Sequence, residues 1–285
     1  MNFAEKAAKG VLEAVLSKVK LTYRDQQGNG EYDFDLRYPD GRPAAVEVTC
    51  SVDQLQMQTH AAIHSKKKSP VIVASRCKKT WWITLMRKAN INTIREKADA
   101  YLATLEDAGI TEFSEFGVNE SKQIKEASLH SIFEERVMPE CVECLRDDLM
   151  LQAGGVISSE GSPRIILGFP IYGGAVGPEC AINAGNTEAW KDDNRKKLGA
   201  ATTKERYLVI LMHVMNGLAW TALTDSDPPV TLPELPPEID HRWLLADVGG
   251  RAANKFVVWR ASKTMHWQKL LVDIPITASS VPRVC

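Results

Sequence analysis

Residues 31–49 constrain the fold of this chain more than any other segment. The tripeptide Pro39-Asp40-Gly41 joins a residue that presets φ, a residue that initiates turns and a residue that tolerates the left-handed region. It therefore predicts a tight turn between two strands. With these three residues as the loop, we expect an antiparallel β-hairpin in which Asp33 lies opposite Glu47.

The alternation of apolar and polar residues agrees with this register. Apolar side chains fall on one face of the hairpin, and acidic side chains fall on the other. Like charges that oppose each other on a sheet repel, so the acidic face either contacts solvent or holds a cation. Oxygen ligands of this kind suit Mg²⁺, Mn²⁺ or Ca²⁺. The apolar face comprises Tyr32, Phe34, Leu36, Ala44, Val46 and Val48, and the acidic face comprises Asp33, Asp35, Glu47 and Thr49.

Charge and cysteine content bound the class of protein. At 285 residues the chain is long enough for one large domain or two smaller ones. Its net charge of −1 gives no overall attraction to nucleic acid, so a basic surface would have to be local. The cysteines are dispersed, no apolar run reaches spanning length, and the charged first helix lacks a cleavage site for secretion. We therefore expect a cytoplasmic protein with free thiols and no membrane partner.

Residues 2–51 resemble the opening of the PD-(D/E)XK nuclease superfamily. The resemblance rests on the predicted order helix, strand, strand, strand, and on an acid in the second strand followed by Glu47 in the third. It implies an α/β (α+β) fold whose mixed sheet forms a restriction-endonuclease-like core with a helical insertion. It also implies that the strand acids bind Mg²⁺ or Mn²⁺, and these map to Asp33 or Asp35 together with Glu47. The first helix of the family often adds a glutamate, for which Glu13 is the candidate ahead of Glu5.

One position departs from the family pattern. The resemblance implies a catalytic lysine two residues after the third-strand acid, and this chain has Thr49 there. A hydroxyl cannot stabilise developing charge as an ammonium group does. A nearby lysine could supply the missing cation, and such lysines could also bind nucleic acid. Gln54 could orient a water. Lysines are usually ordinary surface residues. The candidates are Lys66, Lys67, Lys68, Lys78 and Lys79.

The predicted elements suggest a division into three parts. Residues 1–110 begin the nuclease-like core, and residues 111–160 are a helical segment. Residues 161–285 supply mixed strands and a helix, which complete the core or form a second subdomain.

Four further motifs have both a functional and an ordinary interpretation. His60 and His64 have a spacing that can chelate zinc, and Cys141-Val142-Glu143-Cys144 could bind a metal, although both pairs are also typical of plain helix faces. The basic helix at 191–197 could contact phosphates or simply be solvated. One ring of the Trp81-Trp82 pair could stack on a nucleic-acid base, while the other packs in the core.

The predicted function is divalent-metal-dependent hydrolysis of DNA, in defence or repair, with Asp33, Glu47 and Thr49 at the reacting centre. The alternative is a catalytically inactive relative that binds nucleic acid or protein, which Thr49 favours. A third hypothesis is an interaction scaffold built on the proline-rich segment 225–237. DNA is the favoured partner, and the sequence leaves a homodimer open.

Overall fold

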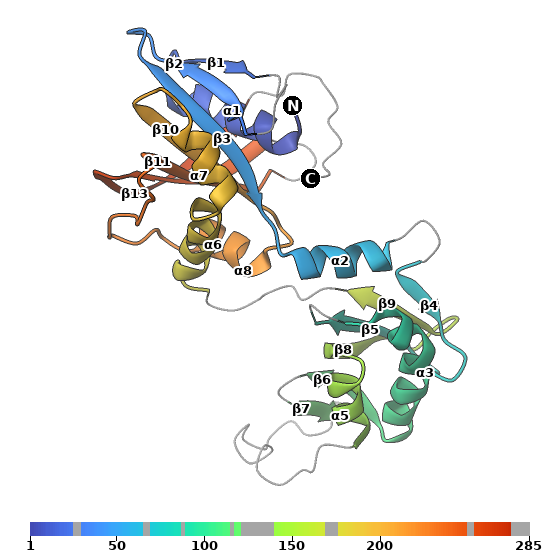
Figure 1. Ribbon diagram of the computed structural model, residues 1–285. Helices are drawn as coiled ribbons and strands as arrows, with labels where there is room; N and C mark the ends of the chain where they lie inside the picture. The colour runs from blue at the N-terminus through green and yellow to red at the C-terminus, as the bar shows by residue number, and fades with distance from the viewer. Residues whose placement is uncertain are drawn as a thin grey trace. The chain divides into compact units, whose positions relative to one another are not determined.

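The computed structural model describes residues 1–24, 30–64, 69–86, 89–114, 117–120, 140–168, 176–249 and 254–274. The chain divides into two compact units. Met1–Asp53 and Tyr172–Cys285 make the discontinuous unit, and Gln54–Ile171 make the inserted unit. The sequence-based boundaries at 110 and 160 fall inside the inserted unit, because strands on both sides of them pair in one sheet. Figure 1 traces the chain.

Among the described residues, the discontinuous unit contains a seven-stranded sheet of order β1-β2-β3-β10-β11-β12-β13. The β3–β10 and β10–β11 pairs are parallel and the other pairs are antiparallel, so the sheet is mixed, as expected. Its strands are β1 (Lys20–Tyr23), β2 (Phe34–Arg37), β3 (Pro43–Ser51), β10 (Glu205–Met212), β11 (His241–Asp247), β12 (Asn254–Ser262) and β13 (Met265–Ile274).

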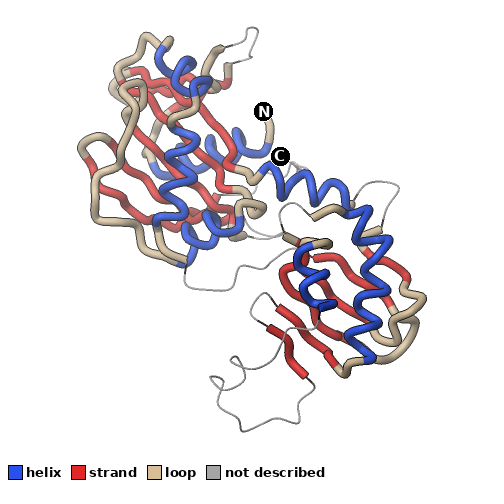
Figure 2. The backbone as a smooth tube through the Cα atoms, turned by 60° about the horizontal axis from the view of Figure 1, so that its bottom comes forward, coloured by secondary structure: helices blue, strands red, loops and turns tan. Residues whose placement is uncertain are grey.

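Helices cover both faces of this sheet (Figure 2). Helix α1 (Phe3–Val15) packs on the face that carries Phe34, Leu36 and Val46. Its apolar residues recur at helical spacing, and Asn2 caps its first turn. The opposite face, which carries Ala45 and Leu208, packs against the other helices. These are α6 (Glu179–Ala189), α7 (Asp192–Gly199) and α8 (Gly217–Asp225).

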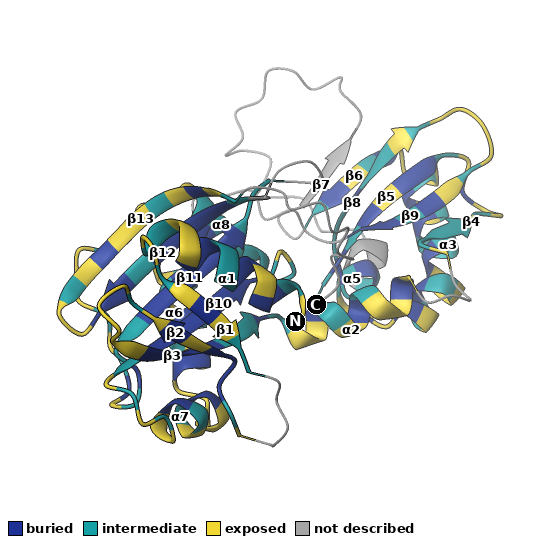
Figure 3. Ribbon diagram, turned by 90° about the horizontal axis from the view of Figure 1, so that it is seen from above, coloured by how far each residue is buried: buried dark blue, intermediate teal, exposed yellow. Residues whose placement is uncertain are grey.

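The hairpin of β2 and β3 has the predicted register. Phe34 pairs with Val46 and Asp35 pairs with Ala45. Gly41 has a φ of 88°, the left-handed conformation that the turn requires. In the part of the sheet that the structure describes, β3 is interior, with β2 on one side and β10 on the other, and the middle of β3 is buried (Figure 3).

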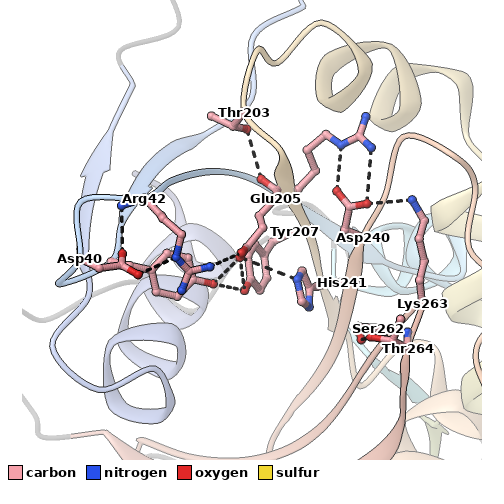
Figure 4. A network of polar contacts seen from close by, with 12 residues as sticks. Asp40, Arg42, Thr203, Glu205, Tyr207, Asp240, His241, Ser262, Lys263 and Thr264 are labelled. Atoms are coloured by element: carbon pink, nitrogen blue, oxygen red, sulfur yellow. Dashed lines mark hydrogen bonds and ion pairs between the residues drawn. The ribbon is translucent and has the colours of Figure 1, made fainter.

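A polar network joins the hairpin turn to the parallel strands (Figure 4). The Tyr38 hydroxyl donates to Glu205 Oε2 at 2.7 Å, and Arg42 Nη1 lies 2.6 Å from Glu205 Oε1. The hydroxyls of Tyr38 and Tyr207 are in contact, and the Tyr207 ring stacks on His241 with 4.2 Å between centroids. Burial raises the pKa of Tyr38 to about 12, so its hydroxyl remains a donor. The network therefore fixes the hairpin against β10 and β11.

The inserted unit has a second mixed sheet, of order β4-β9-β5-β8-β6-β7 within its described residues. Part of the expected helical segment 111–160 is strand, because β6 and β8 pair with each other and β8 pairs with β5. Residues 121–139 lie outside the described residues. The strands are β4 (Val71–Val73), β5 (Thr80–Leu85), β6 (Ile110–Ser114), β7 (Gly117–Glu120), β8 (Leu151–Ser158) and β9 (Arg164–Gly168), and the helices are α2 (Gln54–Ile63), α3 (Ile91–Asp107) and α5 (Glu140–Asp147).

Removal of the central carboxylate of the polar network should destabilise the discontinuous unit. We expect Glu205→Ala to lower the free energy of unfolding by about 1–3 kcal/mol, because partly buried donors on Tyr38 and Arg42 lose their acceptor. Glu13→Ala is the matched control: Glu13 is exposed, pairs with Lys9 at 3.0 Å, and should contribute less than about 0.5 kcal/mol. Urea unfolding followed by circular dichroism measures both, and equal effects would contradict the structural role of the network.

Candidate metal centre and active site

Asp33 is placed by the start of the hairpin. Its backbone N–H donates to the Val46 carbonyl at 3.0 Å, which holds it against β3 just before β2 begins. Its carboxylate turns inward and accepts a hydrogen bond from the Val48 N–H at 2.7 Å. The residue is only 3% exposed. The side chain is thus fixed by backbone contacts on a central strand.

Glu47 lies in the middle of β3, where it pairs with Leu208 of β10. It is 2% exposed and shares its face of the sheet with Ala45, toward the helices that follow the inserted unit. Its Oε1 accepts a hydrogen bond from Lys197 Nζ at 2.9 Å. Its Oε2 is buried and has no hydrogen-bond partner among the described residues. A buried carboxylate oxygen without a donor is available to a further ligand.

Lys197 reaches this carboxylate from α7, which packs over β3. Its ammonium group also lies 3.1 Å from Asp193, one helical turn earlier. The Lys197 side chain is 18% exposed, so most of its stem is covered while the ammonium group faces two carboxylates. A cation therefore stands at the acidic pair, on the same side of the sheet as Thr49.

The two acids and the lysine are coupled electrostatically. Burial, reinforced by the nearby Asp33 charge, raises the pKa of Glu47 to about 8, although Lys197 opposes the shift. Burial also raises the pKa of Asp33, against the Val48 N–H that favours its charged form. Burial alone would lower the pKa of Lys197, but hydrogen bonds to Glu47 and Asp193 raise it. Near neutral pH the centre thus holds a charged lysine beside a glutamate that readily takes up a proton.

Thr49 lies in a second polar contact on the same face. Its hydroxyl donates to Glu188 Oε2 at 3.3 Å, and Glu188 at the end of α6 is buried. Lys191 Nζ lies 2.7 Å from the same carboxylate. The side chain of Asn194 donates to the Glu188 carbonyl at 2.8 Å and so helps to hold the α6–α7 connection. The position of the family lysine is therefore occupied by a threonine whose hydroxyl is already bonded.

Two other predicted acids, Asp35 and Glu13, have other partners. Asp35 is exposed, accepts a hydrogen bond from the Tyr32 hydroxyl at 2.8 Å and faces Arg24 at 3.8 Å. Glu13 is exposed and paired with Lys9. The helix glutamate on the Asp33 side is Glu5 instead, and its charge contributes to the raised pKa of Asp33. Glu5 sits in the first turn of α1, where it completes a capping box with Asn2.

The predicted basic residues belong to the inserted unit. Lys66, Lys67 and Lys68 lie outside the described residues. The backbone N–H groups of Lys78 and Lys79 donate to Glu106 at 2.7 and 3.0 Å, and Lys78 Nζ lies 3.1 Å from Asp107. Lys197 belongs to the basic helix at 191–197, which the sequence predicts to contact phosphates or simply to be solvated. Its partner Glu47 lies 150 residues away in the sequence. The spacing of Asp193 and Lys197 predicts an ion pair within the helix, but it does not predict the contact between Lys197 and Glu47.

The two carboxylates have the donor chemistry that hard divalent cations prefer. Asp33 and Glu47 offer carboxylate oxygens, one of them unpartnered, and Mg²⁺ is commonly held by one or two carboxylates together with waters and substrate phosphates. Within the described ranges, no group of three or more His, Cys, Asp or Glu side chains is placed to hold a metal. His60 and His64 lie with ring centroids 4.3 Å apart, and zinc at this pair stays a prediction.

Cys50, Cys77, Cys144 and Cys180 are free thiols. Over the described ranges, no helix has the length and apolar character needed to cross a membrane. Comparison with protein-family profiles, curated proteins and solved structures found no match to this chain.

The raised pKa of Glu47 predicts a pH dependence of stability in the presence of EDTA. Because the folded state binds the Glu47 proton more tightly than the unfolded state, this stabilisation is complete below about pH 4.5 and is lost as the pH rises through about 8. Glu47→Gln stays neutral and should lack the loss. We expect its free energy of unfolding, relative to wild type, to rise with pH by on the order of a few kcal/mol. Thermal unfolding across this range measures it, with Glu13→Gln as control, and parallel profiles would contradict the prediction.

Proposed function

We propose that this chain is a divalent-metal-dependent nuclease that hydrolyses phosphodiester bonds in DNA, with its reacting centre at Asp33, Glu47 and Lys197. The observation that carries the proposal is the 2.9 Å contact between Lys197 Nζ and Glu47 Oε1. Lys197 on α7 thus supplies the cation that is missing from β3, where Thr49 stands in place of the family lysine.

The topology adds support to the resemblance with the PD-(D/E)XK superfamily. The order α1, β1, β2, β3 is present, and the acid before β2 and the acid in β3 approach each other through the predicted register. The charge of Glu5 in α1 contributes to the raised pKa of Asp33. In this proposal, Asp33 and Glu47 take the positions that the family uses for metal ligands, with Glu5 in place of Glu13.

Each residue has a chemical role in this proposal. Asp33 and Glu47 would hold Mg²⁺ or Mn²⁺, which supplies Lewis acidity toward the phosphate and lowers the pKa of a bound water. Lys197 would orient the attacking water and offset negative charge that grows on the phosphorus oxygens. Asp193, one turn away on α7, positions the Lys197 ammonium group. Thr49 and Glu188 fix the helix connection that places α7 over β3.

A cleavage assay with neighbouring lysines tests the role of Lys197. We expect Lys197→Gln to reduce Mg²⁺- or Mn²⁺-dependent cleavage of plasmid and single-stranded DNA by about 10²- to 10³-fold, because the charge that stabilises the transition state is lost. Lys196→Gln is the matched control, since Lys196 is exposed at the preceding position of the same helix. Cleavage by Lys197→Gln at the wild-type rate would remove Lys197 from the mechanism.

Calorimetric titration with Mn²⁺ tests the ligands independently of cleavage. We expect Asp33→Asn and Glu47→Gln to abolish binding, while Asp35→Asn and Glu13→Gln retain it, because the last two carboxylates are exposed and face other partners. Lys197→Gln should bind Mn²⁺ at least as tightly as wild type, since a competing cation is removed. Affinity should weaken by about tenfold for each pH unit below about 8, where Glu47 must lose its proton.

A catalytically inactive relative is the second candidate, and one observation favours it. The hydroxyl of Thr49 is bonded to Glu188, so the family lysine position is filled by a structural contact. Wild-type protein that neither cleaves DNA nor binds Mn²⁺ through Asp33 and Glu47 would support this reading. The interaction scaffold also stays a prediction, and its proline-rich segment exposes Val230 and Leu232.

A further inference from the structure

The sheet of the inserted unit has two faces of different character. One face carries Trp81, Ile83 and Ile165, which pack against apolar residues of α3 and α5. Trp81 is fully buried there, and its indole N–H donates to Glu106 at 2.8 Å. Residues of β5 alternate, so Trp82 points to the opposite face. It is 40% exposed.

Two glycines flank Trp82 on this face. A Cβ atom on Gly168 of β9 would lie 2.3 Å from Trp82 Cζ2 and 2.5 Å from Cε2, so the indole occupies the space above that glycine. On the other side, Trp82 pairs with Gly155 of β8, where an added Cβ would meet only Glu112 Cγ and a backbone oxygen, at 3.8 and 4.0 Å. Two glycines thus let a large aromatic ring lie along the strands with exposed ring surface. Such a surface suits stacking by a planar group.

Cationic side chains gather at one end of the same sheet. Arg164 is the first residue of β9, pairs with Val73 at the end of β4, and is exposed. It shares the open face with Trp82, since Ile166, two residues later, pairs with Trp82. The loop from β4 to β5 emerges at this end and carries the remaining cations, Arg76, Lys78 and Lys79.

Two carboxylates of α3 hold the backbone of this loop. Asp99 accepts hydrogen bonds from the N–H groups of Ser75, Arg76 and Cys77 at 2.8 to 3.2 Å. Glu106 accepts from the N–H groups of Lys78 and Lys79. These hydrogen bonds hold the backbone of the loop in one conformation. The side chain of Arg76 is exposed. Asp107 offsets the charge of Lys78, and Glu112 adds one acid on the β6 side of Trp82.

We propose that the open face of the inserted unit binds single-stranded nucleic acid, with one base stacked on Trp82 and the adjacent phosphates on Arg164 and the cationic loop. A base in a duplex is already stacked on both sides, so an aromatic platform selects unpaired bases. The assignment of nucleic acid as the partner rests on the proposed nuclease function and on this pairing of an aromatic ring with cations. The inserted unit thereby supplies substrate capture, and the discontinuous unit supplies hydrolysis.

Fluorescence anisotropy with labelled oligothymidylate in EDTA tests the proposal in the full chain carrying Glu47→Gln, which removes cleavage. We expect an added Trp82→Ala substitution to weaken binding by between about 5-fold and about 100-fold, and Trp82→Phe to retain most of it. Trp190→Ala is the matched control, since Trp190 is 49% exposed in the discontinuous unit, and it should bind like the parent. Arg164→Gln should weaken binding and reduce its salt dependence. A duplex of the same length should bind more weakly than the single strand.

A second measurement avoids any effect of Trp82→Ala on folding. An oligonucleotide with 5-iodouridine should form its photo-crosslink at Trp82 in the chain that keeps this tryptophan. Absence of oligonucleotide binding by the parent, equal binding by Trp82→Ala, or a crosslink confined to the discontinuous unit would each overturn the proposal. Self-association that Trp82→Ala abolishes, with no nucleic-acid binding, would assign the face to a second copy instead. Metal-dependent cleavage is measured separately, so either proposal can fail while the other stands.

Discussion

The ion pair between Lys197 and Glu47 is the contact on which the arrangement of the discontinuous unit depends. Two carboxylates buried on neighbouring strands repel each other and lose hydration, and removal of their cation would leave an uncompensated buried charge. The contact also requires α7 to lie over β3, and the chain then continues into β10, which pairs with β3. The charge of the acidic pair is thus balanced only when α7 lies over β3.

Local rules predicted the parts of the centre that are close in sequence. The turn at Gly41 fixes which residues of β2 and β3 face each other, and the alternation along the strands fixes their sides, so the register from Phe34–Val46 onward followed from the sequence. Helical spacing does not show which turn of α1 approaches the hairpin. In the structure Glu13 is exposed and pairs with Lys9, whereas Glu5 lies in the capped first turn. Asn216-Gly217 shows the limit of such local rules: the dipeptide favours a hairpin turn, yet Gly217–Asp225 form α8, because short apolar runs suit strand and helix alike.

Contacts between distant segments could not be obtained in this way. Lys197 is separated from Glu47 by the whole inserted unit, and no composition change marks where that unit begins at Gln54. Strand β4 pairs with β9, and β5 pairs with both β8 and β9, across segments that were divided between three predicted regions. Pairing of this kind is decided by which apolar faces meet, and a single sequence does not carry that information in any local pattern.

The position of the inserted unit has a consequence for how the centre can form. Asp33 and Glu47 precede it, whereas Glu188 and Lys197 follow it, so the acidic pair gains its cation only when the returning chain adds β10 beside β3. In the folded unit the Asp33 charge favours the protonated form of Glu47, and Lys197 opposes this effect. The lysine therefore stabilises the completed sheet as well as the chemistry proposed for it. A lysine at position 49 would have placed its cation on β3 before the sheet was complete, whereas a lysine on α7 couples the charge of the centre to correct closure of the discontinuous unit.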